Sequence, residues 1–262
     1  MTNLFDLTGK VAVITGGSRG LGLEMATALA AAGSSVVITA RREQWLKSAE
    51  EELRSKRFDV LAVTCDVSNP EQVGAAVQAT VAKFGRLDIL INNAGISWGE
   101  PAETMSVEKW RQVFETNATG TFLMSQAAGN EMMRNSPAEG EAHQRGSIIN
   151  IASVAGITGV ETDVLDAVGY SASKGAVITL TRDLAVKWAK RGIRVNAIAP
   201  GFFDTRLSHA LLEKTQKKIE KTTPMGRIGK PGELGGVAVF LASAAASYIT
   251  GQVIAVDGGK TA

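Results

Sequence analysis

The chain has 262 residues, of which 45% are hydrophobic and 21% charged, proportions typical of soluble globular proteins. Its net charge of +2 speaks against a nucleic-acid-binding protein, and its single cysteine, Cys65, excludes a disulfide framework. With only two histidines, His143 and His209, we expect no metal site. No apolar run approaches the about 18 residues of a membrane span, and the first residues lack the pattern of a secretory signal. We therefore expect a cytoplasmic protein that has no membrane partner.

Short apolar runs alternate with amphipathic stretches along the chain. The apolar runs predict strands at 10–15, 35–39, 60–64, 87–91, 147–151, 194–198 and 253–256. The amphipathic stretches predict helices at 21–32, 43–56, 70–84, 107–133, 171–190 and 233–242. Continuous Val and Ile runs separated by helices are typical of parallel strands buried on both faces. The pattern predicts one α/β domain over residues 1–262, a Rossmann fold whose doubly wound, seven-stranded parallel sheet has helices on both faces.

Two segments fit this alternation poorly. Residues 135–145 are polar and include Pro137 and Gly140, so we expect an exposed loop there. Residues 202–230 are helical only in part, and from Arg206 to Lys230 they hold seven Lys or Arg against two Glu. This second segment is therefore locally basic.

A glycine-rich turn joins the first predicted strand to the first helix and reads Thr15-Gly16-Gly17-Ser18-Arg19-Gly20-Leu21-Gly22. Glycines let the backbone approach a pyrophosphate, and a helix N-terminus offers N–H donors and a favourable dipole to the anion. The spacing departs from G-x-G-x-x-G, and an ordinary tight turn is the alternative. Because the turn follows the first strand of a parallel pattern, we predict a nucleotide site formed by Gly16, Ser18, Arg19, Gly20, Leu21 and Gly22.

The end of the second strand indicates which dinucleotide binds. A carboxylate there would bind the ribose 2′-hydroxyl of NAD, but the sequence has Arg41 and Arg42, with no carboxylate before Glu43. Guanidinium groups form charge-assisted and often bidentate bonds with phosphate, so Arg41, Arg42 and Arg19 favour the 2′-phosphate of NADP. NAD is the alternative cofactor, and a solvated helix start is the alternative role for Arg41 and Arg42.

Two further strand ends carry polar residues. Asp66 and Val67 follow the third strand, and Asn93, Ala94 and Gly95 follow the fourth. Ligands of open α/β sheets bind at the carboxyl ends of strands, so we expect both segments to border the nucleotide. Asp66 would accept a hydrogen bond from the adenine amino group. Turn formation is the alternative for both segments.

Tyr170 and Lys174 lie four residues apart near the start of a predicted helix, which puts both on one face. Tyrosine, with a pKa of about 10, is a poor acid–base catalyst at neutral pH, but a nearby ammonium lowers that pKa. Ser153 follows the fifth strand, where its hydroxyl can hold a substrate carbonyl while Tyr170 donates a proton. The alternative for Tyr170 and Lys174 is a surface pair.

The chain thus carries one ordered set of features: Gly16, Gly20, Gly22, Asn92 to Gly95, Asn117, Ser153, Tyr170, Lys174, Pro200 and Gly201. In this order and spacing they resemble the short-chain dehydrogenase/reductases over nearly the whole chain. The resemblance implies reversible hydride transfer between a nicotinamide and a carbonyl or alcohol, with Tyr170 as general acid or base. It implies that Lys174 binds the nicotinamide ribose and lowers the tyrosine pKa, and that Ser153 orients the carbonyl. Asn117 would hold a water that links Lys174 to solvent.

The resemblance also implies where the cofactor lies. Asn93 would border the adenosine side, and Pro200, Gly201 and Phe203 would lie near the nicotinamide, with Thr205 as the partner of its amide. An arginine at the position of Arg41 usually accompanies NADP in this family. The family usually forms tetramers, so we expect a homotetramer.

Within the family the chain looks closest to 3-oxoacyl-thioester reductases and gluconate 5-dehydrogenases. We expect residues 202–230 to form a lid and the pocket walls to be Ile96, Trp98, Val154, Val164, Leu165 and Phe202. These apolar walls favour an acyl chain, linked to coenzyme A or a carrier protein, over a sugar acid or another polyol or ketone, which is the alternative. Glu161, Asp163 and Asp166 would instead suit sugar hydroxyls, and the stretch from Ser153 to Tyr170 is longer than usual for the family.

A different class of protein, a dinucleotide-binding sensor without catalysis, is the remaining alternative. Such a module would have no use for the set Asn117, Ser153, Tyr170 and Lys174. The sequence therefore predicts an oxidoreductase acting on a small carbonyl or alcohol substrate.

Overall fold

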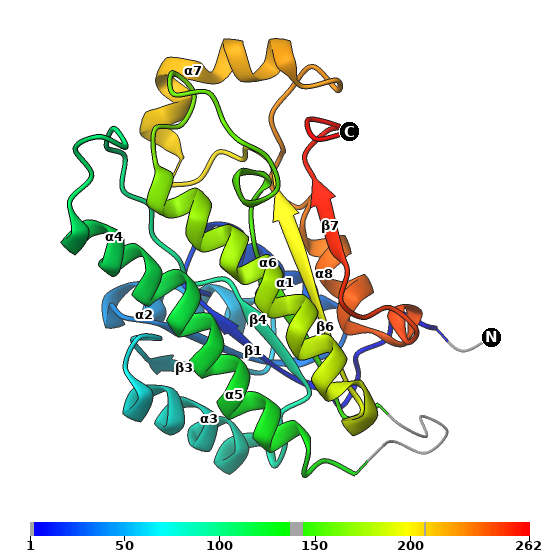
Figure 1. The fold of residues 1–262 in the computed structure, drawn as a ribbon. Helices are drawn as coiled ribbons and strands as arrows, with labels where there is room; N and C mark the ends of the chain where they lie inside the picture. Colours follow the sequence, from blue (N-terminus) through cyan, green and yellow to red (C-terminus); the bar gives the residue numbers. More distant parts are fainter. Residues whose placement is uncertain (1–2, 137–143, 207) are drawn as a thin grey trace.

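Seven parallel strands form one sheet in the computed structural model, which describes residues 3–136, 144–206 and 208–262 (Figure 1). The strands are β1 (Val11–Thr15), β2 (Ser35–Ala40), β3 (Val60–Thr64), β4 (Ile89–Asn92), β5 (Gly146–Ile151), β6 (Ile193–Pro200) and β7 (Val253–Val256). Their order is β3-β2-β1-β4-β5-β6-β7. The chain runs from the centre to one edge, returns to the centre and runs to the other edge, which confirms the doubly wound Rossmann fold.

Helices cover both faces of the sheet. They are α1 (Gly20–Ala31), α2 (Glu43–Ser55), α3 (Pro70–Phe84), α4 (Val107–Phe114), α5 (Gly120–Met132), α6 (Val168–Trp188), α7 (His209–Thr222) and α8 (Gly235–Ala242). Side chains alternate along β1, so Ala12 and Ile14 pack with α1, α2 and α8, whereas Val13 packs with α3, α5 and α6. Burial on both faces explains why the strands read as continuous apolar runs.

The helix expected at 107–133 is wrong as a single element. A π-helical turn at Glu115–Thr119 separates α4 from α5 and contains Asn117. The Asn117 side chain exchanges hydrogen bonds with the backbone of Ile96, and the backbone carbonyl oxygen of Asn117 accepts one from Thr121 Oγ1. These contacts fix the wide turn, and such turns often occur at functional sites.

Two other boundaries concern the site. Helix α6 begins at Val168 and not at residue 171, so Tyr170 lies inside its first turn. Figure 1 shows α7 beyond the carboxyl end of β6, where residues 202–230 leave the sheet. Of the loop expected at 135–145, residues 137–143 lie outside the described residues, and so does His143. No helix in the described part is long and apolar enough to cross a membrane.

Candidate active site

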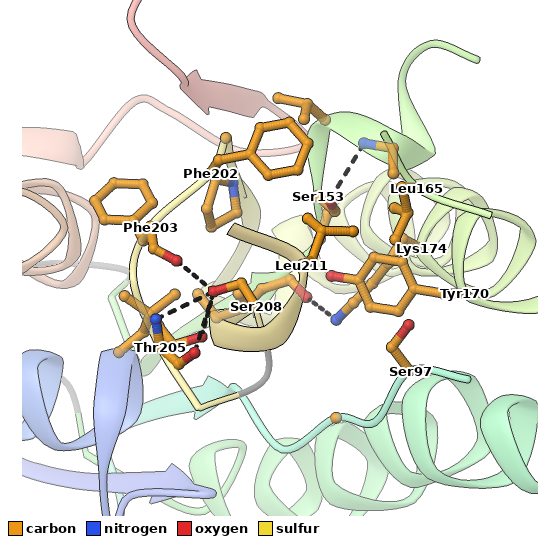
Figure 2. A pocket seen from close by; sticks show the side chains of 18 of the residues that line it. Ser97, Ser153, Leu165, Tyr170, Lys174, Phe202, Phe203, Thr205, Ser208 and Leu211 are labelled. Atoms are coloured by element: carbon orange, nitrogen blue, oxygen red, sulfur yellow. Dashed lines mark hydrogen bonds between the residues drawn. The ribbon is translucent and has the colours of Figure 1, made fainter. Parts of the chain in front are cut away.

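One cavity lies at the carboxyl edge of the sheet, where β1, β4, β5 and β6 end. Figure 2 shows how side chains from distant parts of the chain face it. The lining residues are Leu21, Asn93, Gly95, Ser97, Ile151, Ala152, Ser153, Val154, Ala155, Leu165, Tyr170, Lys174, Pro200, Gly201, Phe202, Phe203, Thr205, Ser208 and Leu211. The structure thus brings together Ser153, Tyr170 and Lys174 with several of the residues expected to bind cofactor. Ser97, Ser208 and Leu211 were missed, because no motif marks them.

The glycine turn lies beside this cavity in a fixed conformation. Gly22 lies in the first turn of α1, and a Cβ at this position would collide with the carbonyl oxygen of Gly16. Only glycine therefore fits at position 22. Gly20 has a φ of +54°, and the space where its side chain would be is open except for Thr205, 3.9 Å away. Asn93 Nδ2 donates to the carbonyl oxygens of Thr15 and Gly16 and thereby holds the turn in place. The turn is therefore a preformed cradle at a helix N-terminus, which suits a pyrophosphate.

Three arginine side chains gather beside this turn. The guanidinium carbons of Arg19, Arg42 and Arg206 lie 3.6, 4.4 and 4.9 Å from the centre of the Trp45 ring. The pKa of Arg19 is lowered by burial and by the charges of the other two arginines. This concentration of positive charge suits a phosphate. Sequence reasoning missed Trp45 and Arg206, because neither belongs to a motif.

Arg41 lies apart from that cluster. Its Nη1 is 3.8 Å from Asp66 Oδ2, and Asp66 also accepts hydrogen bonds from the backbone and hydroxyl of Ser68. Burial raises the pKa of Asp66, but these bonds and the charge of Arg41 outweigh it, so the pKa is lowered. Val67 is buried and packs against Gly120 of α5. Beside the glycine turn, Ala94 N donates to Thr15 Oγ1. Asp66 is therefore an ionised acceptor at the carboxyl end of β3.

The hydroxyls of Ser153 and Tyr170 and the ammonium of Lys174 converge in the cavity (Figure 2). Lys174 is 5% exposed, and its Nζ donates to the carbonyl oxygen of Ile151 over 2.6 Å. Its Nζ lies 5.7 Å from the centre of the Tyr170 ring. A Cβ at Gly95 would lie 3.3 Å from Asn117 Oδ1 and 3.6 Å from Lys174 Nζ, so a larger residue would press on the Asn117 amide rather than on the ammonium.

The pKa values differ from the expectation in one respect. Burial raises the pKa of Tyr170 more than its hydrogen bond with Ser153 lowers it. Burial also lowers the pKa of Lys174 to about 8. The expected lowering of the tyrosine pKa by Lys174 is therefore absent from this structure, because desolvation dominates both groups. The phenol keeps its proton at neutral pH.

Asn117 connects two segments of the site through hydrogen bonds. It is fully buried, and its Nδ2 also donates to Ser173 Oγ, which in turn donates to the carbonyl oxygen of Tyr170. Through Ile96 and Ser173, this amide ties the loop after β4 to the first turn of α6. The side chain thus holds two walls of the cavity at a fixed separation.

Of the expected pocket walls, Val154, Leu165 and Phe202 line the cavity, whereas Ile96, Trp98 and Val164 are not among its lining residues. Trp98 is 42% exposed, donates to Glu100 and lies under the ammonium of Lys109. Val164 is buried against Leu212 and Ile219 of α7. Ile96 is held through its backbone by Asn117. These three expected pocket walls are therefore not confirmed by the cavity lining.

The segment after β6 closes the cavity on the side of α7. Phe203 packs its buried ring against Gly229, and its carbonyl oxygen accepts a hydrogen bond from Ser208 Oγ. Ser208 Oγ also accepts from Thr205 N and lies 3.0 Å from Thr205 Oγ1. Pro200 and Gly201 form the floor beneath, where Gly201 packs closely on Asp257.

Comparisons with known proteins find relatives that match nearly the whole chain. A family model described as enoyl-(acyl carrier protein) reductase matches residues 16–261. The chain is 38% identical to a 3-oxoacyl-(acyl-carrier-protein) reductase of Aquifex aeolicus, covering 97% of this chain and 98% of the relative. It is 38% identical to the gluconate 5-dehydrogenase of Gluconobacter oxydans, covering 99% and 97%. The crystal structure of a gluconate 5-dehydrogenase from Burkholderia cenocepacia, in complex with NADP and tartrate, superposes with a TM-score of 0.89 at 38% identity, covering 98% and 97%.

The sheet and its carboxyl-edge site define the class of protein, a Rossmann-fold oxidoreductase that acts on carbonyl or alcohol groups. With relatives of this identity over nearly the full length of both chains, the protein belongs to the short-chain dehydrogenase/reductase family. The resemblance seen in the sequence motifs is confirmed.

Proposed function

We propose that this enzyme is an NADP(H)-dependent reductase of 3-oxoacyl thioesters. The observation that carries the proposal is the apolar character of the cavity, whose walls include Val154, Leu165, Phe202 and Leu211. Among its described lining residues only Lys174 is charged, and that ammonium already donates to Ile151. An acyl chain fits such walls, whereas the carboxylate of a sugar acid would find no free cation there.

The sugar-acid alternative rests on the hydroxyls of Ser97, Thr205 and Ser208, which also face the cavity. The acidic residues expected to bind sugar hydroxyls do not support it. Asp163 forms an ion pair with Lys218 on α7, and Glu161 and Asp166 are not among the lining residues. The apolar walls therefore outweigh the hydroxyls.

The bound nicotinamide would supply or accept the hydride. In the reductive direction Tyr170 Oη would give its proton to the substrate carbonyl oxygen, and the raised pKa of Tyr170 keeps that proton in place. Ser153 Oγ would donate a hydrogen bond to the same oxygen and fix its position. Lys174 would bind the nicotinamide ribose and supply positive charge beside the phenol. Asn117, whose side chain binds the backbone of Ile96, would hold a water that links Lys174 to solvent and supplies the proton.

The cofactor would lie along the carboxyl edge of the sheet. The cradle formed by Gly16, Ser18, Gly20, Leu21 and Gly22 would hold the pyrophosphate, with Asn93, Ala94 and Gly95 beside the adenosine half. Asp66 and Val67 would border the adenine, and Pro200, Gly201, Phe203 and Thr205 would border the nicotinamide. Arg19 and Arg42 would bind the 2′-phosphate, which favours NADP over NAD. Arg41 pairs with Asp66, so it would lie nearer the adenine than the 2′-phosphate.

The broader organisation is proposed on the family resemblance. Residues 1–262 would form one domain with residues 202–230 as the lid, and four copies would assemble through α4, α5 and α6. The substrate would be a small carbonyl compound, free or linked to coenzyme A or a carrier protein, and the enzyme would work in the cytoplasm.

The substrate proposal is tested with 3-oxoacyl thioesters of increasing chain length and NADPH. Each methylene buried in the cavity contributes about 0.8 kcal/mol, so kcat/KM should rise up to about fourfold per methylene until the cavity is filled. A kcat/KM that does not change with chain length would contradict the assignment of the apolar walls.

A further inference from the structure

The segment that follows β6 lies directly over the glycine turn. Thr205 is the neighbour that faces the open side of Gly20, and in Figure 2 it lies beside the N-terminal elements drawn in blue. Arg206, the next residue, reaches further and places its guanidinium over Trp45 of α2. In the sheet, β6 and β2 are separated by β1, β4 and β5. Arg206 therefore spans the crevice between the proposed lid and the end of β2.

Trp45 is the platform on which this contact forms. Its half-buried ring carries Arg19 from the glycine turn, Arg42 from the end of β2 and Arg206 from the lid, all within 4.9 Å of its centre. Cation–π attraction of this kind stabilises each guanidinium on an indole ring. The same ring thus brings together cations from three separate segments.

The cluster carries an unbalanced positive charge. Among the described residues, no carboxylate lies within 4.0 Å of a guanidinium nitrogen of Arg19, Arg42 or Arg206, and the nearest acidic neighbours in sequence are engaged elsewhere. Glu43 pairs with Lys47, Asp204 contacts His209, and Glu24 accepts hydrogen bonds from the backbone of Leu234 and Gly235. Burial lowers the pKa of Arg19, and the like charges of Arg206 and Arg42 lower it further, since like charges repel one another. A dianion bound among the three would relieve the repulsion.

We propose that Arg206 is a specificity-determining residue that binds the 2′-phosphate of NADP together with Arg19 and Arg42, so that this phosphate holds the lid closed. The inference rests on the proposed preference for NADP and extends it to a residue outside the usual turn and strand-end positions. Because Thr205 and Arg206 are adjacent, a phosphate that fixes Arg206 also fixes Thr205 over the glycine turn. Cofactor choice and closure of the substrate cavity would then depend on the same contact.

Calorimetric titration of NADPH, NADH and 2′,5′-ADP into wild type, Arg206→Gln and Arg206→Lys tests this. A charge-assisted bond to phosphate is worth about 10- to 100-fold in affinity. Arg206→Gln should therefore weaken NADPH and 2′,5′-ADP by at least about 10-fold and leave NADH unchanged, with Arg206→Lys in between. Lys83→Gln, which removes one exposed positive charge on helix α3, should bind all three like wild type.

Hydrogen exchange measures the coupling to the lid. 2′,5′-ADP should slow amide exchange in α7 of the wild type but not in Arg206→Gln. Equal losses for NADH and NADPH in Arg206→Gln would overturn the proposal, because they would indicate a pyrophosphate contact or a structural role. Unchanged NADPH affinity in Arg206→Gln would overturn it while leaving the NADP preference intact. A wild type that binds NADH as tightly as NADPH would instead refute the NADP preference, and this inference with it.

Discussion

Lys174 Nζ donates a hydrogen bond of 2.6 Å to the carbonyl oxygen of Ile151, at the end of the strand that leads to Ser153. Only 5% of Lys174 is exposed, and burial lowers its pKa to about 8. One hydrogen bond does not replace the hydration of a charge. Burial of the charged Lys174 therefore lowers the free energy of unfolding at neutral pH.

Replacing this lysine should stabilise the protein while inactivating it. Its pKa is about 8 in the folded state and near 10.5 when unfolded. The loss of stability caused by burying the charge is therefore greatest below pH 8 and declines as the pH rises towards 10.5. Lys174→Met should raise the free energy of unfolding by ~1–3 kcal/mol at pH 7, and by less at pH 10. Urea denaturation at both pH values measures this, with Lys83→Met as the exposed control. A Lys174→Met protein less stable than wild type at pH 7 would show that the hydrogen bond to Ile151 outweighs desolvation.

Tyr170→Phe should abolish turnover and spare cofactor binding. The substitution removes only the hydroxyl, so the rate should fall by about 10²- to 10⁴-fold, the usual contribution of a general acid. NADPH affinity, measured by titration, should stay within about twofold of wild type. Retained turnover would point to another proton donor, and the loss of cofactor affinity would point to a binding role for the hydroxyl.

The two directions of the reaction should respond oppositely to pH. Reduction needs the protonated phenol, which the raised pKa of Tyr170 maintains at neutral pH. Oxidation needs the phenolate, so its kcat/KM should keep rising as the pH increases above 8, while that of reduction should not rise. Steady-state rates over a pH series in both directions check this. An oxidation profile that levels off near pH 7 would mean that bound cofactor lowers the tyrosine pKa strongly.

Gly22→Ala should damage both stability and cofactor binding. The added methyl group would collide with Gly16 O and Asn93 Nδ2, which the turn cannot move without losing its shape. We expect the free energy of unfolding to fall by more than ~2 kcal/mol and the affinity for NADPH to fall by more than about 10-fold. Gly74→Ala is the matched control, because a Cβ at this position on α3 meets nothing within 4 Å. It should stabilise the protein by about 0.5–1 kcal/mol in thermal denaturation.

The sequence predicts the sheet and the place of the site because both follow from local patterns. Buried parallel strands must be apolar on both faces, and motif residues at strand ends must meet at one edge. The π-helical turn at Asn117 was not predictable, because the apolar periodicity of 107–133 continues across it. Trp98 and Val164 were assigned to the pocket as apolar neighbours of motifs, but sequence does not show which way a loop side chain faces. The cluster on Trp45 joins segments far apart in the chain, so only the structure reveals it.

The measurement that tests the account most directly compares NADPH consumption with an acetoacetyl thioester and with 5-ketogluconate, using NADH as the control cofactor. The apolar cavity and the arginine cluster predict turnover of the thioester with NADPH. Its kcat/KM should be at least about 10-fold above that of the thioester with NADH and that of 5-ketogluconate with NADPH. Turnover of 5-ketogluconate alone would contradict the acyl assignment and make the hydroxyls of Ser97 and Ser208 the substrate contacts. Equal rates with NADH would contradict the role of the arginines.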